Sequence, residues 1–112
     1  MSDCLFCRIA AGTVPATIVH SDDDVVAFRD VDPKAPTHVL VTPREHLASA
    51  AELTPAHDAL WARMLHVAQD VAQADGRSDY RIVVNVGPQA GQSIEHLHLH
   101  VLGGRPMDWP PG

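Results

Sequence analysis

The sequence predicts an α+β protein with a five-stranded antiparallel sheet, one long helix and a short N-terminal helix. Five short apolar segments bounded by turn residues, together with one long amphipathic segment, indicate this class. The length of 112 residues suits one domain, and the composition, 46% hydrophobic and 20% charged, is typical of globular proteins. We therefore expect a single domain over residues 1–112.

The N-terminal part is expected to form a short helix and then a series of strands. In residues 4–11, Leu5 and Ile9 lie four apart on one helical face, and Gly12 stops the helix. Residues 21–24 are rich in aspartate, which is typical of the turn of a hairpin. The strands are expected over residues 16–20, 24–29 and 38–41, the last ending at Pro43.

The C-terminal part is expected to contain the long helix and two more strands. Thr54 is a favourable N-cap and Pro55 suits the first helical turn, so the helix begins there and runs to about Ala74, with Gly76 after its end. Its apolar stripe consists of Leu60, Met64, Val67 and Val71. The remaining segments are strands over 80–86 and 96–102, the loop 87–93 between them, and an extended tail over 103–112.

Composition excludes some classes of partner. The formal net charge is −6 and Lys34 is the only lysine, whereas proteins that bind nucleic-acid backbones present a basic face. No apolar run is long enough to span a membrane, and the N-terminus has no pattern of a secretory signal. We therefore expect a cytoplasmic protein with neither nucleic-acid nor membrane partners.

Three histidines alternate with apolar residues at His96, His98 and His100. On a strand this spacing places all three imidazoles on one face, with His96 and His100 about 13 Å apart at Cα. Binding of one metal by all three histidines would therefore be strained, and different roles for the three histidines are the better interpretation. The middle residue, His98, is suited to attack phosphorus and form a covalent intermediate, while His100 contacts phosphate.

The loop before this strand offers donors for a phosphate group. Its amide, hydroxyl and backbone donors come from Asn85, Gly87, Gly91, Gln92 and Ser93. Taken alone these are ordinary turn residues, and the histidine face alone is also compatible with a zinc site or an accidental polar face. The loop and the histidines together favour phosphate chemistry.

The run His96-Leu97-His98-Leu99-His100-Val101-Leu102 resembles the signature of the histidine triad (HIT) family. Further matches lie at Asp30-Val31, at residues 35–38, 80–85 and 90–93, and in the segment from Val101 through the Trp109-Pro110-Pro111-Gly112 ending, which is similar to the Hint branch. The resemblance implies a HIT-like fold and a homodimer whose two sheets join into a continuous ten-stranded sheet. The tail 103–112 would then reach the partner subunit.

The resemblance also implies an activity, hydrolysis of the P–N bond of purine nucleoside 5′-phosphoramidates of the AMP-amine or AMP-lysine type. His98 would be the nucleophile, His100 would contact phosphate, His38 would orient or shuttle protons, and Ser93 would serve the leaving group. Alternatives are cleavage of dinucleoside polyphosphates, nucleotidyl transfer, or a nucleotide-binding interaction module. The third histidine argues against the transferases, which have glutamine at the position of His100.

By the same resemblance a set of residues binds the nucleotide. Asp30 would accept the ribose hydroxyls, which one carboxylate is able to do. Without the resemblance, Phe6, Val14 and Phe28 would be interpreted as core, and Asp30 as a turn or helix-cap residue. The set is Phe6, Val14, Phe28, Asp30, Val31, Asn85, Gly91, Gln92, Ser93 and Trp109.

The pair Cys4 and Cys7 has the spacing of a metal or redox site, and no βαβ unit is present to favour a thioredoxin-like interpretation. Similarity to bacterial members of the family implies a structural Zn²⁺ on Cys4, Cys7, His46 and His96. This would withdraw His96 from the chemistry of its strand, and catalysis would not require the metal. The alternative is that both cysteines are small buried apolar residues.

Overall fold

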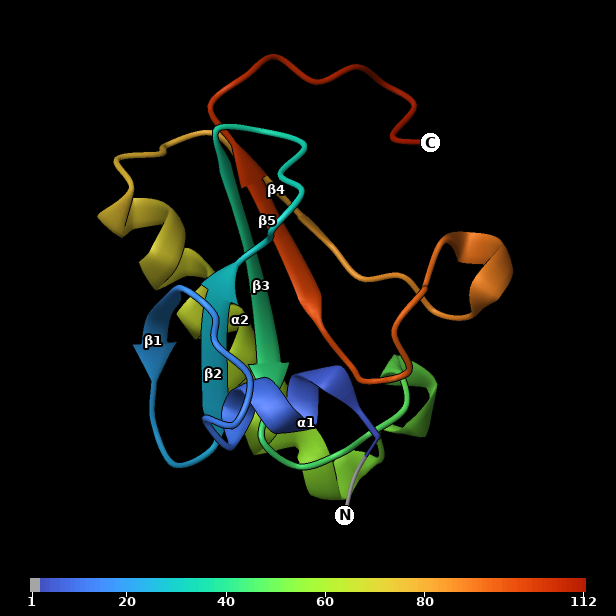
Figure 1. Ribbon diagram of the computed structural model, residues 1–112. Helices are drawn as coiled ribbons and strands as arrows, with labels where there is room; N and C mark the ends of the chain where they lie inside the picture. The colour runs from blue at the N-terminus through green and yellow to red at the C-terminus, as the bar shows by residue number, and fades with distance from the viewer. Residues whose placement is uncertain (1–2) are drawn as a thin grey trace.

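The structure, a computed structural model, describes residues 3–112 and consists of one antiparallel sheet with a helix on each face (Figure 1). The strand order is β1-β2-β3-β5-β4, which confirms the predicted five-stranded α+β class. The helices and strands are α1 (Leu5–Ala10), β1 (Ile18–Ser21), β2 (Val25–Arg29), β3 (Thr37–Pro43), α2 (Asp58–Ala74), β4 (Tyr80–Val83) and β5 (Leu99–Gly103). Short 3-10 turns are η1 (Ala50–Glu52), η2 (Pro55–His57) and η3 (Pro88–Ala90).

The two faces of the sheet bury different residues, because side chains alternate along each strand. Leu97, Leu99 and Val101 pack on the α2 side, in the larger core. The opposite side is covered by α1, whose Phe6 packs with Phe28 and neighbouring apolar side chains. The alternation inferred from the histidine segment therefore holds, and the histidines lie on the α1 side.

The strands on either side of the loop 87–93 are shorter than predicted. β4 ends at Val83 rather than residue 86, and β5 begins at Leu99 rather than His96. The reason is that the chain before Leu99 leaves the ladder, since the Leu97 amide donates to the carbonyl of Leu47 at 2.7 Å. His96 and His98 therefore lie just before β5, where the backbone is not held by a neighbouring strand.

The long helix begins one turn later than predicted. Residues 55–57 form the 3-10 turn η2, in which the Thr54 amide donates to Nδ1 of His57 at 3.0 Å, and α2 follows from Asp58. Its end agrees with the prediction, because Gly76 adopts φ +75°, a left-handed conformation that favours glycine. Among residues 3–112 no helix has both the length and the apolar character that crossing a membrane requires.

An ion-pair network fastens the end of α2 to the sheet. Arg29 of β2 donates to both carboxylate oxygens of Asp75 at 2.6 and 2.9 Å, and the Thr37 hydroxyl donates to Asp75 at 2.9 Å. The hydrogen bonds from Arg29 lower the pKa of Asp75 to about 2. Because Thr37 precedes His38, this network fixes the start of β3 beside the histidines.

Candidate active site and metal centre

His98 is held in one tautomer by the main chain. Its side chain is 7% exposed, and its Nδ1 lies 2.7 Å from the carbonyl oxygen of His96. A carbonyl only accepts, so Nδ1 carries the hydrogen and Nε2 keeps an unshared electron pair. The Phe6 ring stands edge-on to the imidazole, with centroids 5.1 Å apart, and restricts its rotation. The geometry leaves His98 Nε2 available as a nucleophile.

A second chain of hydrogen bonds orients His38 and His100. The Lys34 backbone amide donates to Nδ1 of His38 at 3.0 Å, so the hydrogen of that ring lies on Nε2. This Nε2 donates to Nδ1 of His100 at 2.9 Å, which leaves the hydrogen of His100 on its own Nε2. The ring centroids of His98 and His100 are 5.0 Å apart, so an acceptor Nε2 and a donor Nε2 lie on neighbouring rings.

Burial favours the uncharged form of the His38 and His100 rings. It lowers the pKa of His100 to about 4, and repulsion from His98 and His38 acts in the same direction. Burial also lowers the pKa of His38, although the nearby Asp30 carboxylate opposes this effect. The pair therefore offers a hydrogen-bond donor to a phosphoryl oxygen and not a fixed positive charge.

Asp30, His38 and His100 also have ligand atoms close enough together to suggest a metal site. The tautomers argue against that use. His38 Nδ1 already accepts a hydrogen bond, so a metal on its Nε2 would require the doubly deprotonated ring, which neutral pH does not supply. We assign this group to hydrogen bonding, with the Asp30 carboxylate 3.5 Å from His38 Nε2.

A different cluster fits a metal. The ligand atoms of Cys4, Cys7, His46 and His96 all lie within 4.8 Å of one another. His96 is fully buried and its Nε2 donates to the Pro43 carbonyl at 2.8 Å, so its Nδ1 electron pair points at the cluster. That Nδ1 lies 3.2 Å from the Cys4 sulfur and 3.2 Å from His46 Nδ1.

The chemistry of this donor set matches zinc. Two thiolates and two imidazoles form a set that Zn²⁺ binds tetrahedrally, and the bond from His96 to Pro43 is the outer-shell contact that usually orients a ligating histidine. His46 Nδ1 lies 3.2 Å from the inward electron pair of His96 Nδ1, so a proton or a cation shared by the two nitrogens would stabilise this contact. The four residues named from the sequence therefore come together from three separate segments.

The residues expected around a nucleobase are placed unevenly. Phe6 and Phe28 are both buried, with ring centroids 5.3 Å apart, and Val14 packs against their cluster. Val31 does not join them, because it is 99% exposed on the loop after β2. Trp109 is 83% exposed in the tail, which leaves the end of β5 and crosses beyond the sheet (Figure 1).

The residues expected around phosphate also separate. Asn85 lines a hollow of about 400 Å³ with Asp30, His38 and His100, whereas Ser93 lines another of about 410 Å³ beside Cys4 and His46. Gln92 donates its amide hydrogens to the main-chain carbonyls of Ala48, in the loop after β3, and Ile94, so it joins two loops. Gly91 adopts φ +98°, which explains a glycine there.

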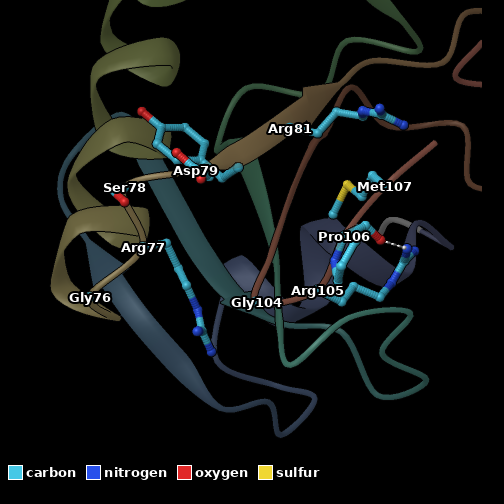
Figure 2. Close-up of a pocket in the computed structure, with 10 residues that line it drawn as sticks. Gly76, Arg77, Ser78, Asp79, Arg81, Gly104, Arg105, Pro106 and Met107 are labelled. Atoms are coloured by element: carbon cyan, nitrogen blue, oxygen red, sulfur yellow. Dashed lines mark hydrogen bonds between the residues drawn. The ribbon is translucent and has the colours of Figure 1, made fainter. Parts of the chain in front are cut away.

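Sequence reasoning missed three main-chain contributors, because backbone groups leave no residue signal: the Lys34 amide, the Pro43 carbonyl and the His96 carbonyl. It also missed a hollow of about 670 Å³ between the start of β4 and the tail, shown in Figure 2. Arg77, Arg81 and Arg105 line that hollow, which contains no histidine, so it is not where the imidazole chemistry takes place.

Comparisons with known proteins identify the family of the chain. The model of the HIT domain matches residues 11–107. An uncharacterized HIT-like protein of Synechococcus elongatus is 45% identical over 98% of this chain and 97% of its own. A 14 kDa zinc-binding protein of Zea mays is 43% identical over 99% of this chain and 89% of its own. The adenylylsulfatase HINT1 of Arabidopsis thaliana is 41% identical over 99% of this chain and 78% of its own.

Solved structures give the same result. The crystal structure of a HIT family hydrolase from Legionella pneumophila superposes with a TM-score of 0.96 at 48% identity, covering 98% of this chain and 100% of that one. A HIT family hydrolase from Clostridium thermocellum reaches a TM-score of 0.93 at 37% identity, covering 96% of each chain.

Proposed function

The chain belongs to the HIT domain family of nucleotide-binding hydrolases, and on this basis we propose that it hydrolyses the P–N bond of purine nucleoside 5′-phosphoramidates. The observation that carries the proposal is the fixed tautomer of His98. Its Nδ1 hydrogen is bound by the His96 carbonyl at 2.7 Å, which leaves Nε2 as a nucleophile beside a donor on His100.

The reaction would proceed in two displacements at the α-phosphorus. His98 Nε2 forms a bond to phosphorus while the P–N bond breaks, and the amine leaves with a proton from solvent. His100 Nε2–H donates to a phosphoryl oxygen, where negative charge grows. The nucleotidylated ring is positively charged and still carries its Nδ1 hydrogen, so the His96 carbonyl stabilises it. Water then attacks phosphorus, releasing AMP and a proton and freeing His98.

We also propose a resident zinc ion on Cys4, Cys7, His46 and His96, in line with the printed name of the Zea mays relative. A closed tetrahedral site of this kind supplies structural linkage and has no open position for water. The four residues would join the start of α1 to the loop after β3 and to the segment that leads into β5.

A homodimer is the assembly that we propose. Within residues 3–112, β4 lies at one edge of the sheet and no strand pairs with its outer side. Apolar side chains that are more than a third exposed lie just after β4, at Val84 and Val86. Pairing of two β4 edges would give the ten-stranded sheet and bring the exposed Trp109 near a second site. Light scattering should give twice the chain mass of 12.1 kDa, and a 12.1 kDa particle would contradict this proposal.

The activity is tested by trapping the intermediate. Mass spectrometry of the protein during turnover of an AMP-amine substrate should show one added AMP, and peptide mapping should place it on His98. His98→Ala should lose turnover and adduct, while the control His66→Ala, an exposed α2 histidine, keeps both. Full turnover by His98→Ala would exclude the mechanism.

A substrate panel separates the remaining activities. Adenylyl sulfate is included because of the name of the Arabidopsis relative, and a diadenosine polyphosphate because it shares the α-phosphorus. The proposal expects the phosphoramidate to have the highest kcat/KM of the three. Binding of AMP with no turnover on the whole panel would instead favour a nucleotide-binding interaction module.

A further inference from the structure

We propose that the Cys4–Cys7–His46–His96 centre positions the nucleophile, so that metal loading governs the tautomer of His98 as well as the stability of the fold. The proposal rests on the function above only for calling His98 the nucleophile. It assigns Cys4 and Cys7, which contact no reacting atom, as positioning residues for catalysis.

The first connection runs through His96. Its side chain contributes Nδ1 to the centre, and its main-chain carbonyl accepts the Nδ1 hydrogen of His98 at 2.7 Å. One residue therefore joins the metal ligands to the tautomer of the nucleophile. Because its Nε2 is also tied to Pro43 at 2.8 Å, His96 is held from both ring nitrogens when Nδ1 is bound.

The second connection is the backbone around His96, which the sheet does not hold. The segment before Leu99 lies outside the β5 ladder, and its bond from the Leu97 amide goes to the Leu47 carbonyl at 2.7 Å. Leu47 directly follows His46, another ligand of the centre. When one ion joins the four ligands, His46 and His96 are both held, and so are the neighbouring residues Leu47 and Leu97 that form this contact. When the ligands separate, both segments are released, and the direction of the His96 carbonyl is less restrained.

The third connection is the Phe6 side chain. Cys4 caps the N-terminus of α1 and Cys7 lies within α1, so the two cysteines bracket Phe6. The Phe6 ring contacts both imidazoles edge-on, with centroids 5.1 Å from His98 and 6.0 Å from His96. Movement of α1 away from His46 and His96 would therefore remove the ring that restricts His98.

The experiment compares metal-loaded and metal-free protein by a signal that needs no substrate. Imidazole ¹⁵N chemical shifts at one fixed pH report the tautomer of His98, assigned by comparison with His98→Gln. Loaded protein should show a hydrogen on Nδ1, metal-free protein a mixture, and zinc should restore the first state. In parallel, kcat should fall about fivefold without metal while KM stays unchanged, as expected for one weakened hydrogen bond.

Two variants separate positioning from general loosening. Cys4→Ser removes a thiolate but keeps a good N-cap for α1, so it should resemble the metal-free protein even with zinc present. Met64→Ala is the stability control. Met64 is fully buried on α2, and the larger core to which it belongs lies on the side of the sheet opposite α1. It should lower Tm and leave the His98 shifts unchanged.

The outcomes are distinct. The proposal would be overturned if metal-free protein or Cys4→Ser kept the Nδ1 tautomer and kcat and lost only Tm. It would also be overturned if Met64→Ala shifted the His98 signals as strongly as Cys4→Ser. Purified protein that takes up no zinc would overturn it as well. If no phosphoramidate is turned over, the proposed function fails, yet the ¹⁵N shifts still decide the positioning role.

Discussion

Removing His100 should make the stability of the protein less dependent on pH. Burial, together with repulsion from His98 and His38, lowers the pKa of His100 from 6.5 to about 4, against the opposing effect of Asp30. The unfolded chain therefore takes up a proton on this histidine before the folded one does. The resulting stability is fully present above pH 6.5 and is lost as the pH falls toward 4.

The magnitude follows from that gap. The difference between 6.5 and about 4 corresponds to about 3 kcal/mol, and we expect about 2 kcal/mol because part of the ring reaches solvent. In the natural protein, His38 Nε2 donates to His100 Nδ1 at 2.9 Å. The variant His100→Gln removes the titrating group, and its amide oxygen is able to accept the same hydrogen bond.

The assay is urea unfolding of the natural protein and His100→Gln at several pH values between about 7 and about 4. The free energy of unfolding of the natural protein should fall by about 2 kcal/mol more than that of the variant over this range. Protonation of the metal ligands affects both proteins equally, so the difference isolates His100. Parallel curves would show that His100 does not titrate as its buried position requires.

Further predictions concern the fold and the metal. Asp75→Asn should cost about 2 kcal/mol in urea unfolding, because it leaves Arg29 without its carboxylate, and an unchanged midpoint would show that the network contributes little. Met64→Ala should cost about 3 kcal/mol because Met64 is fully buried on α2, while kcat at a temperature well below Tm stays unchanged because the α2 side is remote from the histidines. Removal of zinc by a chelator should lower Tm in thermal scans, and Tm should return when zinc is added; a chelator that leaves Tm unchanged would count against a structural zinc.

Most of the fold could be predicted from the sequence, and the residues named as a possible metal cluster do come together in the structure. Alternation of the segment from His96 to Val101 determined which side chains face α2, because neighbouring residues on an extended chain point to opposite faces. The predicted ends of the strands, which depended on local spacing alone, were less accurate. β5 starts at Leu99 because the Leu97 amide bonds to Leu47, a partner fifty residues away that no local pattern indicates.

The contacts of individual loop residues also depend on the folded path of the chain. Gln92 has the donors that a phosphate site needs, but the structure directs both amide hydrogens to carbonyls of its own and a neighbouring loop. Val31 follows Asp30 in the sequence and is 99% exposed, so it does not belong to the buried cluster of Phe6 and Phe28. The residue type determines which hydrogen bonds a side chain is able to form. The folded path of the backbone determines which of these bonds are formed.

The sequence by itself determined the α+β class and the placement of the histidines on one face, and the family resemblance added four possible metal ligands. Only the tertiary structure decided how the imidazoles differ. His98 keeps a free Nε2 because a carbonyl accepts from its Nδ1, and His100 presents a donor because the Lys34 amide fixes the ring of His38. The physical reason is that every backbone carries the same amides and carbonyls, so the folded path alone determines which of them meets each ring.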